Sequence, residues 1–140
     1  MKTHTKLLVA ALLIIFVSCN KKLSPQTSEV QIGDFLIFVE KSNDDRITLY
    51  CKEGCAWKEL SYALPIGKRL QAIDEFGMTN AQKPTPIKDK TLSNFLFTLQ
   101  TTDSGIYLEG IEGTAWTKLS FSLQPYSKQA INQNGMTSIP

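Results

Sequence analysis

Apolar and polar residues in the middle of the chain follow short patterns that are typical of β-strands. Residues 35–40 are mostly aromatic or branched and precede a turn rich in Ser, Asn and Asp. Residues 47–51 place an apolar side chain at every second position, which predicts a half-buried strand. Residues 52–54 then fit a three-residue hairpin loop that ends in glycine. Residues 56–64 and 70–74 predict two further strands.

The same pattern occurs a second time. The frame EG-x-AW-x-x-LS at residues 53–61 returns 59 positions later at residues 112–120. A second frame, QAI-x-x-x-GMT, follows each copy, at residues 71–79 and 129–137. Two gapped identities in the same order indicate an internal duplication.

The duplication predicts the fold class. The repeats span residues 35–79 and 95–137, and residues 80–94 connect them. A unit of about 45 residues seldom buries enough apolar surface to fold alone, so the repeats should share one core. We therefore predict a single all-β domain over residues 34–140. It consists of two tandem four-stranded repeats, packed as a sandwich or an incomplete barrel.

Residues 1–18 have the layout of a signal peptide. Two lysines precede an apolar run over residues 7–17, which is too short to span a bilayer as a helix. The ending Phe-Val-Ser-Cys at residues 16–19 resembles the lipobox of bacterial lipoproteins. This resemblance implies cleavage before Cys19, lipid on its thiol and new amino group, and anchoring in a membrane. The alternative is an ordinary cleaved signal followed by an unrelated cysteine.

Residues 19–33 are polar and predict a tether between the anchor and the domain. In some lipoproteins, acidic residues after the lipidated cysteine direct surface export, and an adjacent Asp favours retention in the inner membrane. Residues 20–22 are Asn-Lys-Lys and match neither signal. The resemblance therefore implies the periplasmic face of the outer membrane, within the cell envelope.

Cleavage would also change the chemistry that the chain carries. Two of the 15 Lys and Arg residues lie within residues 1–18, which leaves 13 against 13 Asp and Glu. A net charge near zero gives no support to nucleic-acid binding. His4 is the only histidine and would be lost with the signal, which excludes histidine-dependent catalytic triads and histidine metal ligands. We therefore predict no catalytic residues, no metal site and no cofactor.

Cys51 and Cys55 form the strongest candidate site. If they flank a hairpin loop, their side chains point to the same side at a spacing that suits a disulfide. The oxidising periplasm would favour that bond. The equivalent positions of the second repeat are Gly110 and Thr114, so both cysteines are absent there together. This joint absence indicates that the two cysteines act as a pair, and we favour a structural disulfide.

Three alternatives to the structural disulfide remain open. The first is a redox-active pair, which loosely resembles the Cys-x3-Cys of copper-delivery proteins but lacks their distant histidine. The second is a Cu(I) site formed by both thiolates with Met78 or Met136. The third is a pair of free thiols.

Trp57 and Trp116 are candidate ligand-binding residues with two conflicting interpretations. Along their own strands they share a side with polar residues, which suggests an outward platform for sugars. The register of the predicted hairpin instead places Trp57 opposite Leu49 on the apolar face. A bulge near residues 58–59 and 117–118 would reconcile the two patterns. We predict burial, because two exposed tryptophans would be a liability without a partner.

The acidic pairs Asp44–Asp45 and Asp74–Glu75 are interpreted as turn residues and not as pairs for general acid–base catalysis. Residues that are adjacent on a strand point to opposite faces, so the two carboxylates of a pair would not act together.

By elimination we expect a lipid-anchored envelope protein that acts as a non-catalytic binding module for a protein or a polysaccharide. The alternatives are a thiol-redox or Cu(I)-handling lipoprotein that uses Cys51 and Cys55, and a stalk or assembly factor without a ligand.

Overall fold

The computed structural model describes residues 32–44, 46–63, 70–82 and 88–140. The described residues form strands and no helix, which confirms the all-β prediction. None of the described residues forms a helix that is long and apolar enough to cross a membrane. The strands are β1 (Leu36–Lys41), β2 (Arg46–Glu53), β3 (Glu59–Ala63), β4 (Gln71–Asp74), β5 (Gly77–Thr79), β6 (Leu96–Thr101), β7 (Gly105–Glu112), β8 (Lys118–Ser122), β9 (Lys128–Asn132) and β10 (Gly135–Thr137).

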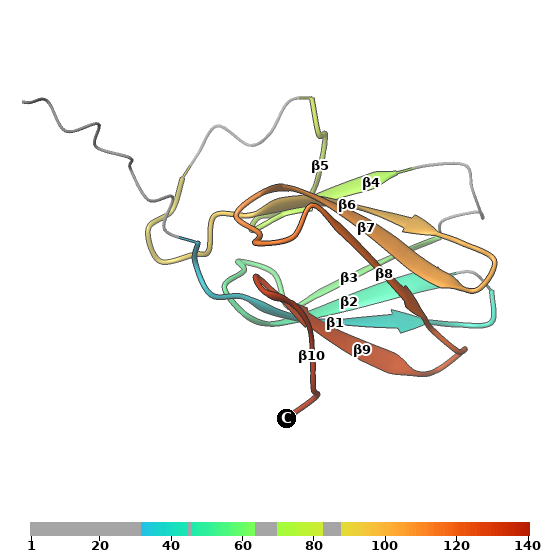
Figure 1. The fold of residues 1–140 in the computed structure, drawn as a ribbon. Coiled ribbons are helices and arrows are strands. Elements are labelled where there is room, and N and C mark those ends of the chain that lie inside the picture. Colours follow the sequence, from blue (N-terminus) through green and yellow to red (C-terminus); the bar gives the residue numbers. More distant parts are fainter. Residues whose placement is uncertain (1–31, 45, 64–69, 83–87) are drawn as a thin grey trace, which may run out of the picture.

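The strands form two antiparallel sheets of five strands each, which face each other as a sandwich (Figure 1). Sheet A has the order β10-β9-β1-β2-β3, and sheet B has the order β5-β4-β6-β7-β8. Each repeat therefore contributes three strands to one sheet and a two-stranded hairpin to the other. The two repeats are intertwined, because each completes the sheet of its partner. We call β4–β5 and β9–β10 the exchanged hairpins.

One hydrophobic core lies between the sheets and contains side chains from both repeats. In sheet A, Ile131 of β9 pairs with Ile37 of β1, and in sheet B, Ile73 of β4 pairs with Phe97 of β6. All four side chains are completely buried. The predicted shared core is therefore confirmed, and the exchange of hairpins is the means by which it forms.

The equivalent residues Phe35 and Phe95 lie beside each other near the start of β1 and β6, with 4.6 Å between their ring centroids. A contact between equivalent residues of the two repeats marks the approximate two-fold axis that relates them. Both rings are buried, so the core is continuous across that axis.

Each repeat has five strands rather than the four that we predicted. The additional strands, β5 and β10, contain only three residues each, Gly-Met-Thr. Three residues are too few to show an alternating apolar pattern. They form strands because each pairs with the preceding strand of its exchanged hairpin.

The predicted hairpin between the second and third strands was wrong in its register. Residues 52–54 do not form a three-residue loop, because β2 continues to Glu53 alongside β1. The connection to β3 is longer, and Leu49 pairs with Leu60 rather than with Trp57. The strand predicted over residues 56–64 begins only at Glu59.

Candidate functional site

The structure places the predicted cysteine sites as follows. Cys19 and most of the predicted tether lie outside the described residues. Cys51 and Cys55 form a disulfide, as predicted, with their Cα atoms 6.2 Å apart. Met78 on β5 and Met136 on β10 belong to different sheets, and each has about half of its surface exposed. A disulfide is compatible with both the structural and the redox interpretation of the cysteine pair.

The two tryptophans are buried, as predicted, with 8% and 9% of their surfaces exposed. Trp57 precedes β3 of sheet A, and its Nε1 donates a hydrogen bond to Asp74 O in sheet B at 3.0 Å. Trp116 precedes β8 of sheet B, and its Nε1 donates to Asn132 O in sheet A at 3.0 Å. Each tryptophan therefore joins one sheet to the exchanged hairpin of the other sheet through a hydrogen bond. This burial excludes a sugar-binding platform on the indole rings.

The backbone geometry that we predicted around the buried tryptophans requires correction. The expected bulge within the third strand is absent, because residues 54–58 are not part of a strand. This irregular loop changes the side on which residues point, so Trp57 and the partly buried Leu60 both reach the core. The register shifts in these sheets occur instead at Lys52 of β2 and Ile111 of β7. Leu36 pairs with Glu53 and Ile37 with Cys51, and in the second repeat Leu96 pairs with Glu112 and Phe97 with Gly110.

Local backbone geometry explains why glycine occupies this position of the repeated frame. Gly54 and Gly113 have φ angles of 85° and 68°, in the left-handed region that favours glycine. A Cβ atom on Gly54 would lie 2.7 Å from Asp34 O, and one on Gly113 would lie 1.8 Å from Asn94 O. The frame therefore combines a glycine that permits close backbone approach with a tryptophan that joins the sheets.

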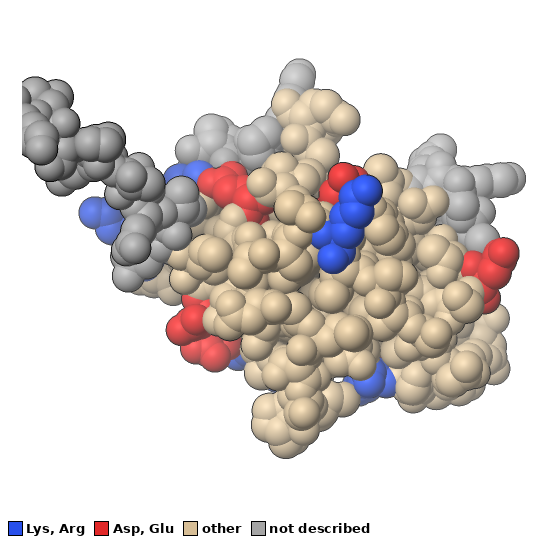
Figure 2. All heavy atoms as spheres, viewed as in Figure 1, with Lys and Arg blue, Asp and Glu red and all other residues tan. Residues whose placement is uncertain are grey.

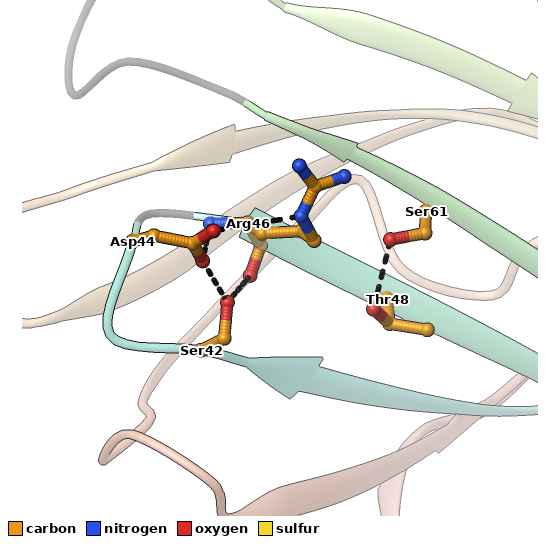
Figure 3. Close-up of polar contacts among 5 residues, drawn as sticks. All are labelled: Ser42, Asp44, Arg46, Thr48 and Ser61. Carbon is orange, nitrogen blue, oxygen red and sulfur yellow. Dashed lines mark hydrogen bonds and ion pairs between the residues drawn. The ribbon is translucent and has the colours of Figure 1, made fainter.

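Asp44 and Asp74 have the predicted role in turns, whereas Asp45 lies outside the described residues. Asp44 accepts hydrogen bonds from Ser42 Oγ and from the backbone N–H of Arg46, within the hairpin between β1 and β2 (Figure 3). The bond from Ser42 lowers the pKa of Asp44. Asp74 Oδ1 accepts the backbone N–H groups of Phe76 at 2.8 Å and Gly77 at 3.0 Å, which closes the β4–β5 turn.

Glu75 is only 3% exposed, and this burial raises the pKa of its carboxyl group. The backbone N–H of Phe95 donates a hydrogen bond to the carboxylate and partly opposes that shift. The equivalent residue of the second repeat is Gln133, whose Oε1 accepts the N–H of Phe35 at 3.2 Å. The side chain at this position therefore holds the start of a core strand in both repeats, whether or not it is charged.

The face of sheet A that points away from the core carries two aromatic rings, each with a lysine over it. We call Phe38, Glu40, Tyr50, Lys52 and Lys128 the aromatic face. Phe38 of β1 lies directly opposite Tyr50 of β2. Lys52 Nζ lies 5.4 Å from the centroid of the Phe38 ring, and Lys128 Nζ lies 4.4 Å from that of Tyr50. Both distances are typical of cation–π contacts.

Charged groups lie next to Tyr50. Lys128 Nζ lies 3.2 Å from Glu40 Oε2, so one ammonium group contacts both a ring and a carboxylate. Burial, and after it the negative charge of Glu40, raise the pKa of the Tyr50 hydroxyl. A tyrosine hydroxyl is already protonated at neutral pH at its ordinary pKa, so Tyr50 is able to donate a hydrogen bond. Beside it, Thr48 Oγ1 and Ser61 Oγ lie 3.2 Å apart and add polar groups to the same side of the sheet (Figure 3).

The second repeat shows that the fold does not require the aromatic face. In sheet B, Thr98 lies opposite Glu109, in the register in which Phe38 lies opposite Tyr50 in sheet A. The remaining equivalents of Glu40, Lys52 and Lys128 are Gln100, Ile111 and Leu70. The same architecture is thus built with and without the rings and their lysines.

Two open depressions lie along β9 and β10, and the larger of them adjoins the aromatic face. The larger has a volume of about 550 Å³ and is lined by Lys128, Gln129, Met136, Thr137, Ser138 and Ile139. The second, of about 390 Å³, also includes Thr137 and Ser138 and reaches Leu36 and Asn132. Because Lys128 belongs both to the larger depression and to the aromatic face, these surfaces are continuous. Residues beyond β10 line part of both depressions. This end of the chain leads away from the sandwich (Figure 1).

Sequence reasoning missed this face. Phe38 and Tyr50 alternate with core residues, so they were read as ordinary members of strands. The signal that could have found them is the difference between the repeats, since Thr98 and Glu109 occupy the same positions in the second copy.

Potential metal ligands and charged side chains do not gather at one place in the described part of the chain. Its His, Cys, Asp and Glu residues form no group of three or more that could hold a metal ion. On the side of the molecule seen in Figure 2, charged side chains are scattered over a surface that is mostly uncharged. The chain matches no protein-family model, no curated protein and no solved structure in the comparisons that we made.

Proposed function

We propose that this chain is a lipid-anchored protein of the cell envelope whose domain binds polysaccharide through the aromatic face, without catalysis. The lipobox-like ending at Cys19 supports the anchor, and residues 20–22 support the periplasmic face of the outer membrane. The observation that carries the binding role is the presence of two lysine-covered rings on one outer face, where the duplicated face has Thr98 and Glu109.

The chemistry of the face suits sugars. One side of a pyranose ring presents C–H groups, which pack on an aromatic ring, whereas its edge presents hydroxyl groups. Phe38 and Tyr50 supply rings, and Lys52, Lys128 and Glu40 supply hydrogen-bonding groups at their borders. Surface lysines hold such positions weakly, so a sugar ring can replace the ammonium group over each aromatic ring. The adjoining depressions provide room for neighbouring sugars of a chain.

The test uses residues 20–140, which omit Cys19 and contain the whole described domain. Phe38→Thr with Tyr50→Glu gives sheet A the residues that sheet B already carries at these positions. We expect this variant to fold and to lose at least about 10-fold in affinity for purified envelope polysaccharides, since stacking on rings contributes on the order of 1 kcal/mol per contact. Binding is measured by cosedimentation with insoluble polysaccharide and by calorimetry with soluble fragments.

The matched control changes an aromatic residue on the other outer face. Tyr107→Ser on β7 should leave polysaccharide binding unchanged, because Tyr107 points away from the core of sheet B. The proposal fails if the unaltered domain binds none of the polysaccharides, or if the double variant of the aromatic face binds as well as the unaltered domain.

A further inference from the structure

The disulfide between Cys51 and Cys55 encloses a ring of only five residues at the end of β2. Its two sulfur atoms have different surroundings. Cys51 is 4% exposed and belongs to the hydrophobic core, whereas Cys55 is partly exposed and packs at the border of that core. A reagent in solvent therefore reaches Cys55 far more readily than Cys51.

The second repeat shows what the loop looks like without the disulfide. There, Gly110 and Thr114 replace the cysteines, and Thr114 Oγ1 donates a hydrogen bond to Trp116 O at 2.8 Å. The backbone bond from Cys51 N to Lys58 O measures 3.0 Å, and its counterpart from Gly110 N to Thr117 O is also 3.0 Å.

The contacts between this loop and the opposite sheet also match. The bonds from Ala56 N to Glu75 O and from Ala115 N to Gln133 O both measure 2.8 Å. The two indole hydrogen bonds to the exchanged hairpins are equal at 3.0 Å. The loop geometry therefore does not depend on a disulfide. Opening the bond in the first repeat should leave the fold in place and change only its immediate surroundings.

We propose that Cys51 and Cys55 form a reversible dithiol–disulfide couple on the folded domain, which exchanges with a dithiol protein through Cys55. This activity is independent of polysaccharide binding. The thiolate of the partner attacks Cys55 Sγ, a mixed disulfide forms, and Cys51 leaves as a thiolate that takes up a proton. The second thiol of the partner then attacks the partner's sulfur atom that is bonded to Cys55. The partner's disulfide forms, and Cys55 is released as a thiolate that takes up a proton. The domain gains two electrons and two protons, and the partner dithiol becomes a disulfide.

Three measurements on residues 20–140 test the couple, with dithiothreitol and glutathione as the probes. First, dithiothreitol should reduce the native domain fully, with the far-ultraviolet circular dichroism spectrum retained, and air or oxidised glutathione should restore the bond. Second, Cys51→Ala should form a mixed disulfide with oxidised glutathione at Cys55. Third, Cys55 in that variant should be alkylated at least about 10-fold faster than Cys51 in Cys55→Ala, because reaction rate follows access to the sulfur.

The matched control is Cys51→Gly with Cys55→Thr, which gives the first repeat the residues of the second. It should fold and show no exchange with glutathione. The proposal is overturned if reduction unfolds the domain, if reduction requires denaturant, or if Cys51 reacts as fast as Cys55. Failure of polysaccharide binding would leave all these outcomes unchanged, so the two proposals are tested separately.

Discussion

Replacing Trp57 by alanine should remove one of the two indole hydrogen bonds that join the sheets. The side chain is 92% buried, and its N–H group donates to Asp74 O of the exchanged hairpin at 3.0 Å. The change therefore removes core packing on one side of the sandwich and leaves a carbonyl oxygen without this donor.

The expected loss follows from these two contributions. A buried aromatic side chain removes about 150–250 Å² from water, which at about 25 cal/mol per Å² corresponds to roughly 4–6 kcal/mol. Truncations of such residues in protein cores destabilise by about 3–5 kcal/mol, because the surrounding side chains relax only partly. The indole hydrogen bond accounts for about 1 kcal/mol of that amount. We therefore expect Trp57→Ala to lower the free energy of unfolding by about 3–5 kcal/mol.

Urea denaturation followed by far-ultraviolet circular dichroism measures this loss without relying on tryptophan fluorescence. Trp116→Ala is the matched control and should cost a similar amount, since its burial and its hydrogen bond are nearly identical. Trp57→Phe keeps most of the apolar surface but loses the N–H donor, so it should cost about 1–2 kcal/mol and remain measurable if the alanine variant is unfolded. A loss below about 1 kcal/mol for Trp57→Ala would refute the conclusion that the indole packs in the core and joins the two sheets.

Three further predictions concern positions at which the repeats differ. Tyr62→Phe should stabilise the domain by about 1 kcal/mol in urea denaturation, because the Tyr62 hydroxyl oxygen is buried and has no hydrogen-bond partner among the described residues. Glu75→Gln should stabilise the domain at pH 7 and have little effect near pH 4. Burial raises the pKa of Glu75 above its unfolded value, so its contribution is complete below the unfolded pKa and is lost as pH rises through the folded pKa; equal effects at both pH values would contradict this. Cys51→Gly with Cys55→Thr should cost at most about 2 kcal/mol, the loop-entropy contribution expected for a five-residue ring, and a larger loss would show that the bond also supports packing.

The elements that the sequence predicts well are those in which one residue pattern determines one structural outcome. Alternation over residues 47–51 predicts β2, and the repeated frames predict the duplication and the shared core. The burial of Trp57 also follows, because an exposed indole without a partner is unfavourable.

The features that escape prediction depend on distant pairing. Which sheet a hairpin joins is decided by partners in the other repeat, such as Ile37 for Ile131 and Phe97 for Ile73, and no local pattern records that choice. The register of β2 and β3 escapes for a related reason. Gly54 fits a tight hairpin turn, but here it permits close approach to Asp34 in a longer loop. A tight hairpin turn and this longer loop both favour glycine at position 54, so the sequence does not distinguish them.

The aromatic face could be recognised only by combining the fold with the duplication. A single sequence shows that Phe38 and Tyr50 lie outward, but it does not show that Lys128 reaches the Tyr50 ring. That contact depends on β9 being placed beside β1, and therefore on the exchange of hairpins.

The exchange has a consequence for how such a face arises after duplication. Each outer face combines side chains from both repeats, so Tyr50 and Glu40 of the first repeat meet Lys128 of the second. The contacts around Tyr50 therefore require residues of both repeats. In sheet B, the corresponding positions hold Glu109 from the second repeat and Leu70 from the first, a pair that forms neither a cation–π contact nor an ion pair. The two repeats have thus diverged at paired positions across the exchange, and the binding face proposed for sheet A belongs to the intertwined domain rather than to either repeat.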